Sequence, residues 1–156
     1  MKAVNLDGTI KTYSSIPKSW GNVVGGFDTL SDSDLESYGF YDVITPSYNY
    51  NIQELGSIEW DSNNSVFTYP VENKEFSQSL AEMKAQKIEN LKHMYGQELS
   101  KTDWIIIRDQ ELGNTTDSDI ASSRAGLRSD CTTHETAINN KTTKAQVADY
   151  SLPSFI

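Results

Sequence analysis

The chain has 156 residues, 37% of them hydrophobic, and a formal net charge of −9 at pH 7. This length fits one typical domain or two very small ones, and the low apolar share indicates a thin core that a partner or self-association would help to stabilise. The acidic balance argues against nucleic acid and anionic membranes as partners, because both need a concentrated basic surface.

Residues 1–73 are rich in Gly, Ser, Asn, Asp and aromatic side chains, which predicts a small antiparallel β region. Asp7-Gly8 is a dipeptide that accepts the positive φ angles of a type I′ turn. The flanking segments, residues 4–6 and 9–13, are therefore predicted to form a hairpin. Trp20, in the loop that follows, is expected to pack inward.

A short helix is predicted over residues 29–36. Ser31 is a good N-cap for it, and Gly39 is a good C-terminal stop. Residues 41–45 follow as a strand, which Pro46 is expected to end because proline cannot continue the hydrogen-bond ladder.

A second hairpin is predicted from residues 55–60 and 66–71, which flank a cluster of turn-forming residues at 61–65. Pro70 has no N–H group, so the second of these strands is expected at the edge of a sheet. Eight aromatic side chains lie between residues 38 and 69. We expect most of them to form a core, with some left for an interface.

The pattern changes near residue 74. From there to residue 95 the chain lacks Gly and Pro and places apolar side chains at helical spacing, and Gly96 is expected to end this helix. Lys84 and Lys87 interrupt the apolar stripe, and their stems are expected to lie over its edge.

Two further helices are predicted after this one. The second begins at a cap on Ser100 or Thr102 and ends at Gly113, and the third begins at Asp117 or Ser118. The third helix carries a heptad-like seam with alternating spacings of four and three, formed by Ile120, Arg124, Leu127, Cys131, His134 and Ile138.

These elements predict an α+β fold in two regions. Residues 1–73 form a β region of two hairpins and a short helix, and residues 74–156 form a helical hairpin or bundle of about three helices. The tail, residues 150–156, is apolar and extended and is expected to dock on a neighbouring molecule. The N-terminus lacks the apolar stretch of a secretory signal, and no apolar run approaches the roughly 20 residues that span a bilayer.

Cys131 and His134 lie three residues apart on one predicted helix face, a spacing that a metal site can use. Zinc needs about four ligands and the only other histidine is His93, so we interpret the pair as seam residues. The pair also lacks the third, orienting group of a nucleophile and base. We therefore predict no enzyme activity, no cofactor and no metal. The single cysteine excludes an internal disulfide and fits synthesis in a reducing cytoplasm.

Arg108, Arg124 and Arg128 are open to two interpretations. They form either a small basic patch or internal ion pairs with nearby carboxylates such as Asp103 and Asp109. The ion pairs are favoured, because the acidic residues lie close in sequence.

Two segments carry a family resemblance. The first runs from IPKSW at residues 16–20 through LSDSDL at 30–35 and GFYDV at 39–43 to VFTY at 66–69. The second is TDWIIIR at residues 102–108, followed by Gly113 and by two arginines, Arg124 and Arg128. In this order they resemble small proteins of tailed bacteriophages, in particular tail, tail-fibre and tail-assembly accessory proteins.

The resemblance implies a non-enzymatic, structural or accessory role near the fibres or baseplate of a phage tail. It places the protein in the virion after synthesis in the host cytoplasm, with other tail or fibre proteins, or a second copy, as partners. Large aromatic side chains dominate interface energetics, so the expected anchors are Trp20, Trp60, Trp104 and Phe155. The alternative is a tail-fibre assembly chaperone that is absent from the mature virion. A metal-dependent hydrolase is disfavoured, because the sequence offers no ligand set.

Overall fold

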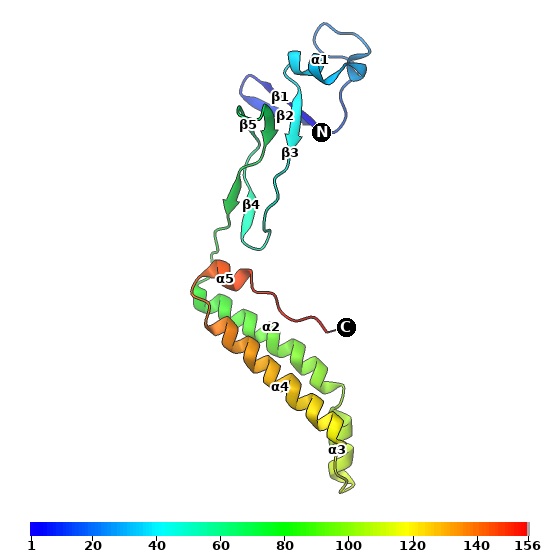
Figure 1. Cartoon of the computed structure of the whole chain (residues 1–156), viewed down its shortest axis with the longest axis vertical. Coiled ribbons are helices and arrows are strands. Elements are labelled where there is room, and N and C mark those ends of the chain that lie inside the picture. Colours follow the sequence, from blue (N-terminus) through cyan, green and yellow to red (C-terminus); the bar gives the residue numbers. More distant parts are fainter. Residues whose placement is uncertain (156) are drawn as a thin grey trace. The chain divides into compact units, whose positions relative to one another are not determined.

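The computed structural model describes residues 1–155 and shows an α+β protein (Figure 1). The chain divides into two compact units, here called the N-terminal unit (residues 1–74) and the C-terminal unit (residues 75–156). The N-terminal unit contains β1 (Lys2–Leu6), β2 (Thr9–Tyr13), the 3-10 helix η1 (Phe27–Thr29), α1 (Asp32–Ser37), β3 (Tyr41–Ile44), β4 (Gln53–Leu55), β5 (Glu59–Asp61), β6 (Val66–Thr68) and β7 (Val71–Asn73).

The first hairpin forms as predicted. β1 and β2 pair antiparallel, from Leu6 opposite Thr9 outward. The two turn residues have positive φ angles, 51° at Asp7 and 88° at Gly8, as a type I′ turn requires. The side chain of Asn5 accepts a hydrogen bond of 2.9 Å from the Gly8 N–H, which fixes the turn to the end of β1.

The five-stranded sheet has the order β2-β1-β3-β6-β5, with β3 and β6 parallel and the other pairs antiparallel. The predicted second hairpin is confirmed for β5 and β6, whereas Leu55 belongs to β4, which pairs with β7 in a separate two-stranded sheet. The prediction that Pro70 marks an edge strand is wrong, because β6 lies between β3 and β5. Pro70 instead follows the end of β6, where its missing N–H breaks no ladder bond.

The core of the N-terminal unit lies on one face of β1. Its buried members are Val4, Phe27, Leu35 and Phe40, and the irregular segment between β2 and β3 supplies most of the covering side chains. The predicted short helix is confirmed as α1, with the Ser31 side chain accepting from the Asp34 N–H. This largely irregular segment, rather than a long helix, therefore covers the core face of β1.

The C-terminal unit contains α2 (Leu80–Ser100), α3 (Asp103–Glu111), α4 (Ser118–Asn139) and α5 (Lys144–Ala148). α2 and α4 lie side by side (Figure 1). A capping box between Ser79 and Glu82 starts α2, and Asp117 caps α4 as predicted. The expectation that Gly96 ends α2 is wrong. α2 continues to Ser100, because its packing on α4 extends beyond the glycine and outweighs the roughly 1 kcal/mol that glycine costs in a helix.

The core of this unit is formed by buried Leu91, Tyr95 and Ile138, with Leu127 and Cys131 of the predicted seam packed against it. The apolar tail also packs here, through Tyr150, Leu152 and Phe155. The expectation that the tail docks on a neighbouring molecule is therefore wrong: it covers the core of its own unit.

Candidate interaction surfaces

Helix α3 presents large apolar side chains to solvent. Trp104 is 59% exposed, Ile107 56% and Leu112, at the C-cap, 67%. Trp104 and Ile107 are three residues apart and therefore lie on the same side of the helix. A cluster of this kind is typical of a surface that another protein covers.

The guanidinium of Arg108 orients the exposed indole of Trp104. It lies 5.2 Å from the ring centroid, and its Nη2 donates a 2.7 Å hydrogen bond to the buried Asp109 carboxylate. A cation over an indole contributes about 0.5–1 kcal/mol at an exposed site. One face of the ring is thereby held while the rest stays accessible, which limits the entropy that a partner must remove on binding.

Arg124, buried on α4, fixes the junction between α2 and α3. Its Nη1 donates to the carbonyl oxygen of Leu99 at 2.6 Å and to the hydroxyl of Thr102 at 2.5 Å, and its Nη2 donates to Asp103 at 2.6 Å. The favoured interpretation of ion pairs is thus confirmed for Arg124 and Arg108. Arg124 therefore links the end of α2 to the start of α3 and fixes the orientation of α3.

A second candidate surface lies on the five-stranded sheet of the N-terminal unit. The rings of Tyr41 and Trp60 have centroids 4.5 Å apart, and both contact the buried ring of Phe67. Together with Asn5 and Gly39 these rings line a hollow of about 280 Å³. Trp60, 39% exposed, forms its rim.

The other two predicted anchors are engaged within the chain. Trp20 packs inward as expected and contacts Phe40 edge-to-face, with centroids 4.8 Å apart. Phe155 packs edge-to-face on Tyr95, with centroids 4.9 Å apart. Of the four predicted anchors, Trp60 and Trp104 therefore have the larger exposed areas.

Cys131 and His134 lie on the α4 seam. The Nδ1 atom of His134 is 2.6 Å from the hydroxyl of Tyr150, so this histidine helps to hold the tail. Burial, followed by the charge of Glu135, raises the pKa of the Cys131 thiol, which disfavours the thiolate that nucleophilic chemistry needs. Among residues 1–155 no group of three or more His, Cys, Asp or Glu side chains is arranged to hold a metal ion.

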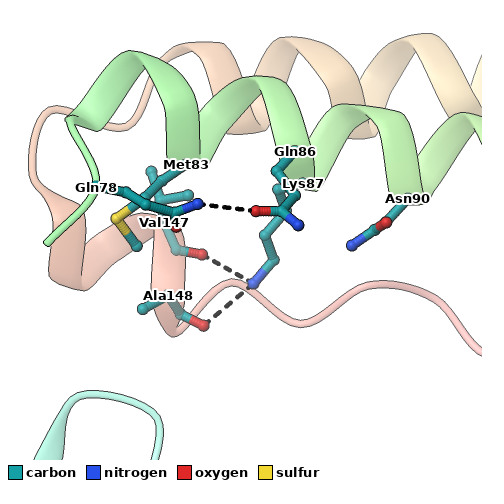
Figure 2. Close-up of a pocket in the computed structure, with 7 residues that line it drawn as sticks. All are labelled: Gln78, Met83, Gln86, Lys87, Asn90, Val147 and Ala148. Atoms are coloured by element: carbon teal, nitrogen blue, oxygen red, sulfur yellow. Dashed lines mark hydrogen bonds between the residues drawn. The ribbon is translucent and has the colours of Figure 1, made fainter. Parts of the chain in front are cut away.

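A small hollow of about 180 Å³ lies between α2 and α5. Figure 2 shows the Lys87 ammonium reaching two carbonyl oxygens at the end of α5, those of Val147 at 2.8 Å and Ala148 at 3.1 Å. Burial lowers the pKa of Lys87, and the charge of Asp149 opposes this shift. The amine is therefore committed to capping a helix terminus.

The roles of two groups of residues were not predicted from the sequence. Asn5 and Gly39 line the sheet hollow. The uncharged alternate positions of β1 and β3 are the signal that would have grouped Asn5 with Tyr41, whereas Gly39 precedes β3 and lies outside that pattern. For Lys84 and Lys87 only the position of the stems was predicted. Their amines donate to carbonyl oxygens at the ends of α4 and α5, which was not predicted. No local signal identifies such caps, because donor and acceptor are more than fifty residues apart.

No family model, curated protein or solved structure matches the chain. Within the described residues, no helix combines the length and apolar character that crossing a membrane requires.

Proposed function

We propose that this protein is a non-enzymatic structural or accessory component of a bacteriophage tail, in the fibre or baseplate region, and that it acts by docking to other tail proteins. The observation that carries this proposal is the exposed apolar side of α3. Trp104 and Ile107 of that side belong to the TDWIIIR segment, which also carries the resemblance to tail accessory proteins. A buried role in an assembled particle explains why such side chains are placed in solvent in the isolated chain.

The proposal is tested by quantitative mass spectrometry of gradient-purified particles beside the crude infected lysate. The expected result is a fixed copy number in the particle. Abundance in the lysate combined with absence from particles would overturn the virion assignment and support the alternative, a tail-fibre assembly chaperone.

The docking role of α3 is tested by Trp104→Ala. Truncating a well-buried interface aromatic costs about 2–4 kcal/mol of binding, so incorporation into particles should be strongly reduced. Trp104 is exposed and its described ring contact is with Arg108 of the same helix, so helical circular dichroism should be unchanged. Gln110→Ala, an exposed polar change on the same helix, is the matched control. Normal incorporation of the Trp104 variant would show that α3 is not the docking helix.

A further inference from the structure

Helix α3 carries more apolar side chains than its own unit buries. Residues 104–107 are four consecutive apolar residues, of which Ile105 and Ile106 are half-buried, whereas Trp104 and Ile107 are exposed. Among the described residues, the packed core of the C-terminal unit has no member on α3. The helix lies at the end of the α2–α4 pair (Figure 1). Its apolar side is therefore uncovered in the isolated chain.

A carboxylate lies on the same side of the helix as the two exposed apolar residues. With 3.6 residues per turn, Glu111 falls within about 20° of Trp104, seven residues earlier, and within about 40° of Ile107, four residues earlier. The side chain of Glu111 is exposed, and within residues 1–155 its carboxylate makes neither a hydrogen bond nor an ion pair. A partner that covers Trp104 and Ile107 therefore meets this carboxylate at the edge of the contact.

The other charges of α3 already have partners. The Oδ1 atom of Asp103 accepts from Arg124 at 2.6 Å, and Arg108 donates to Asp109 at 2.7 Å. Of the charged residues of α3, Glu111 is the one that the described part of the chain leaves without an opposite charge. A carboxylate that loses water on binding is costly unless the partner supplies a cation or a hydrogen-bond donor.

We propose that the exposed side of α3 packs against an amphipathic helix of a partner protein that carries lysine or arginine beside its apolar side, opposite Glu111. Side chains at i, i+3 and i+7 form a row that fits the groove of a second helix. Charged residues beside such an apolar row set partner choice and orientation. Residues 101–119 contain five carboxylates and two cations, which favours a basic helix further. The inference rests on the proposed function and names the chemistry of the partner of the same helix.

A second copy of this chain fits the exposed side of α3 less well. If two copies paired antiparallel about Ile107, Glu111 of one copy would face Asp103 of the other, because each lies four residues from Ile107. If they paired parallel, Glu111 would face Glu111. Both arrangements bring like charges together, which is destabilising. The same acidic stretch disfavours an anionic lipid surface, which attracts basic helices.

The test uses the full chain and two synthetic peptides, each held helical by a side-chain lactam bridge. Both carry leucine and isoleucine on one side. One has lysines beside this side, and the other has glutamates at the same positions. Each peptide is titrated into the labelled protein while the indole N–H signals are followed by nuclear magnetic resonance. The lysine peptide should shift the Trp104 indole and leave that of Trp60 in place. It should bind at least about fivefold more tightly than the glutamate peptide, and added salt should narrow this difference.

Charge reversal at Glu111 tests whether this residue sets the preference. Glu111→Lys should make the glutamate peptide the tighter ligand, and Glu111→Gln should bring the two affinities to within about twofold of each other. Glu89→Lys is the matched control, because Glu89 is an exposed carboxylate on α2 and its reversal changes the net charge equally. This control should keep the preference for the lysine peptide.

Equal binding of the two peptides, no binding of either, or an unchanged preference in Glu111→Lys would overturn the proposal. A dimer of the parent chain that Trp104→Ala dissociates, or a Trp104 indole that shifts with phosphatidylglycerol vesicles, would also overturn it in favour of another occupant. The particle-incorporation test is separate from these results. If Trp104→Ala lowers incorporation while neither peptide binds, the docking role of α3 stands and the basic-helix partner does not.

Discussion

The N-terminal unit is held together by aromatic rings, whereas the C-terminal unit relies on helix packing and on cations at helix ends. In the first, Trp20 stacks with Phe27 at a centroid distance of 6.3 Å, and Phe27 meets Phe40 at 5.3 Å. These rings order a segment that has little regular structure. Large side chains with few rotatable bonds can do this, because each buries much area for little lost entropy.

The C-terminal unit buries few large side chains. Its helix-end carbonyl groups instead accept hydrogen bonds from lysine and arginine side chains that are distant in sequence. Lys84 donates to the carbonyl oxygen of Asn139, at the end of α4, at 2.7 Å. Lys87 and Arg124 do the same for α5 and α2. Each cation neutralises the negative end of a helix dipole and satisfies carbonyl groups that have no partner within the helix. The comparison shows two ways in which a chain with a small apolar fraction can order itself.

The largest effect is expected for Phe40→Ala, which tests whether the aromatic core of the N-terminal unit is independent of the helical core. Removing a fully buried phenylalanine costs about 3–5 kcal/mol, which is a large part of the stability of a unit this small. Ring-dependent near-ultraviolet circular dichroism of the N-terminal unit should be lost, while the helical far-ultraviolet signal remains. Tyr50→Ala, at an exposed position, should change neither signal. Simultaneous loss of the helices would show that the two cores are not independent.

The second test removes the cation at the junction of α2 and α3. Arg124→Ala leaves the Leu99 carbonyl group and the Asp103 carboxylate without their donor, and we expect a loss of about 2–3 kcal/mol of unfolding free energy. Arg124→Lys should recover little of it, because one ammonium cannot reproduce the guanidinium fork. Urea unfolding measures both, with exposed Arg128→Ala as the control that should stay within about 0.5 kcal/mol of the parent. Full recovery by lysine would mean that charge alone, rather than the fork, holds the junction.

The two units also differ in how far their structure could be predicted from sequence. Local signals gave the β1–β2 hairpin, α1, β3 and the caps of α1 and α4, because turn chemistry and capping depend on a few adjacent residues. The parallel pairing of β3 with β6 escaped prediction, since register between distant strands has no local signature. The same reason hid the hollow around Trp60, whose lining residues come from four strands. The helix end predicted at Gly96 was wrong because tertiary packing outweighed the low helix propensity of glycine.

For Cys131 and His134, by contrast, a local pattern was enough to predict that their side of the helix is packed. Their spacing on a helix was interpretable as a seam without knowledge of the fold, and the structure places Cys131 against the core. The contact from His134 to Tyr150 needed the path of the tail, which the sequence left open. Local periodicity thus identifies which face of a helix is buried, but not which segment covers it.

The smallest expected effect concerns the hydroxyl of Tyr95, which donates a short hydrogen bond to the Asp130 carboxylate. Burial, and then this bond and the charge of Asp130, raise the pKa of Tyr95 above the ordinary value of about 10. The folded protein therefore holds this proton more tightly than the unfolded chain. The stabilisation is complete below about pH 10 and is lost as the pH rises through the interval above it.

Tyr95→Phe should accordingly cost about 1 kcal/mol at pH 8, where the hydrogen bond is intact, and less at pH 11. Urea unfolding followed by helical circular dichroism at both pH values measures this difference. Tyr48→Phe, at an exposed position of the other unit, controls for the tyrosine-to-phenylalanine change itself. The lowered pKa of Lys87 acts in the opposite direction but equally in parent and variant, so it cancels in the comparison. The difference in unfolding free energy between the parent and Tyr95→Phe could instead stay constant from pH 8 to pH 11. That result would show that the Tyr95 proton is not linked to folding and that the contact with Asp130 holds α2 against α4 through geometry alone.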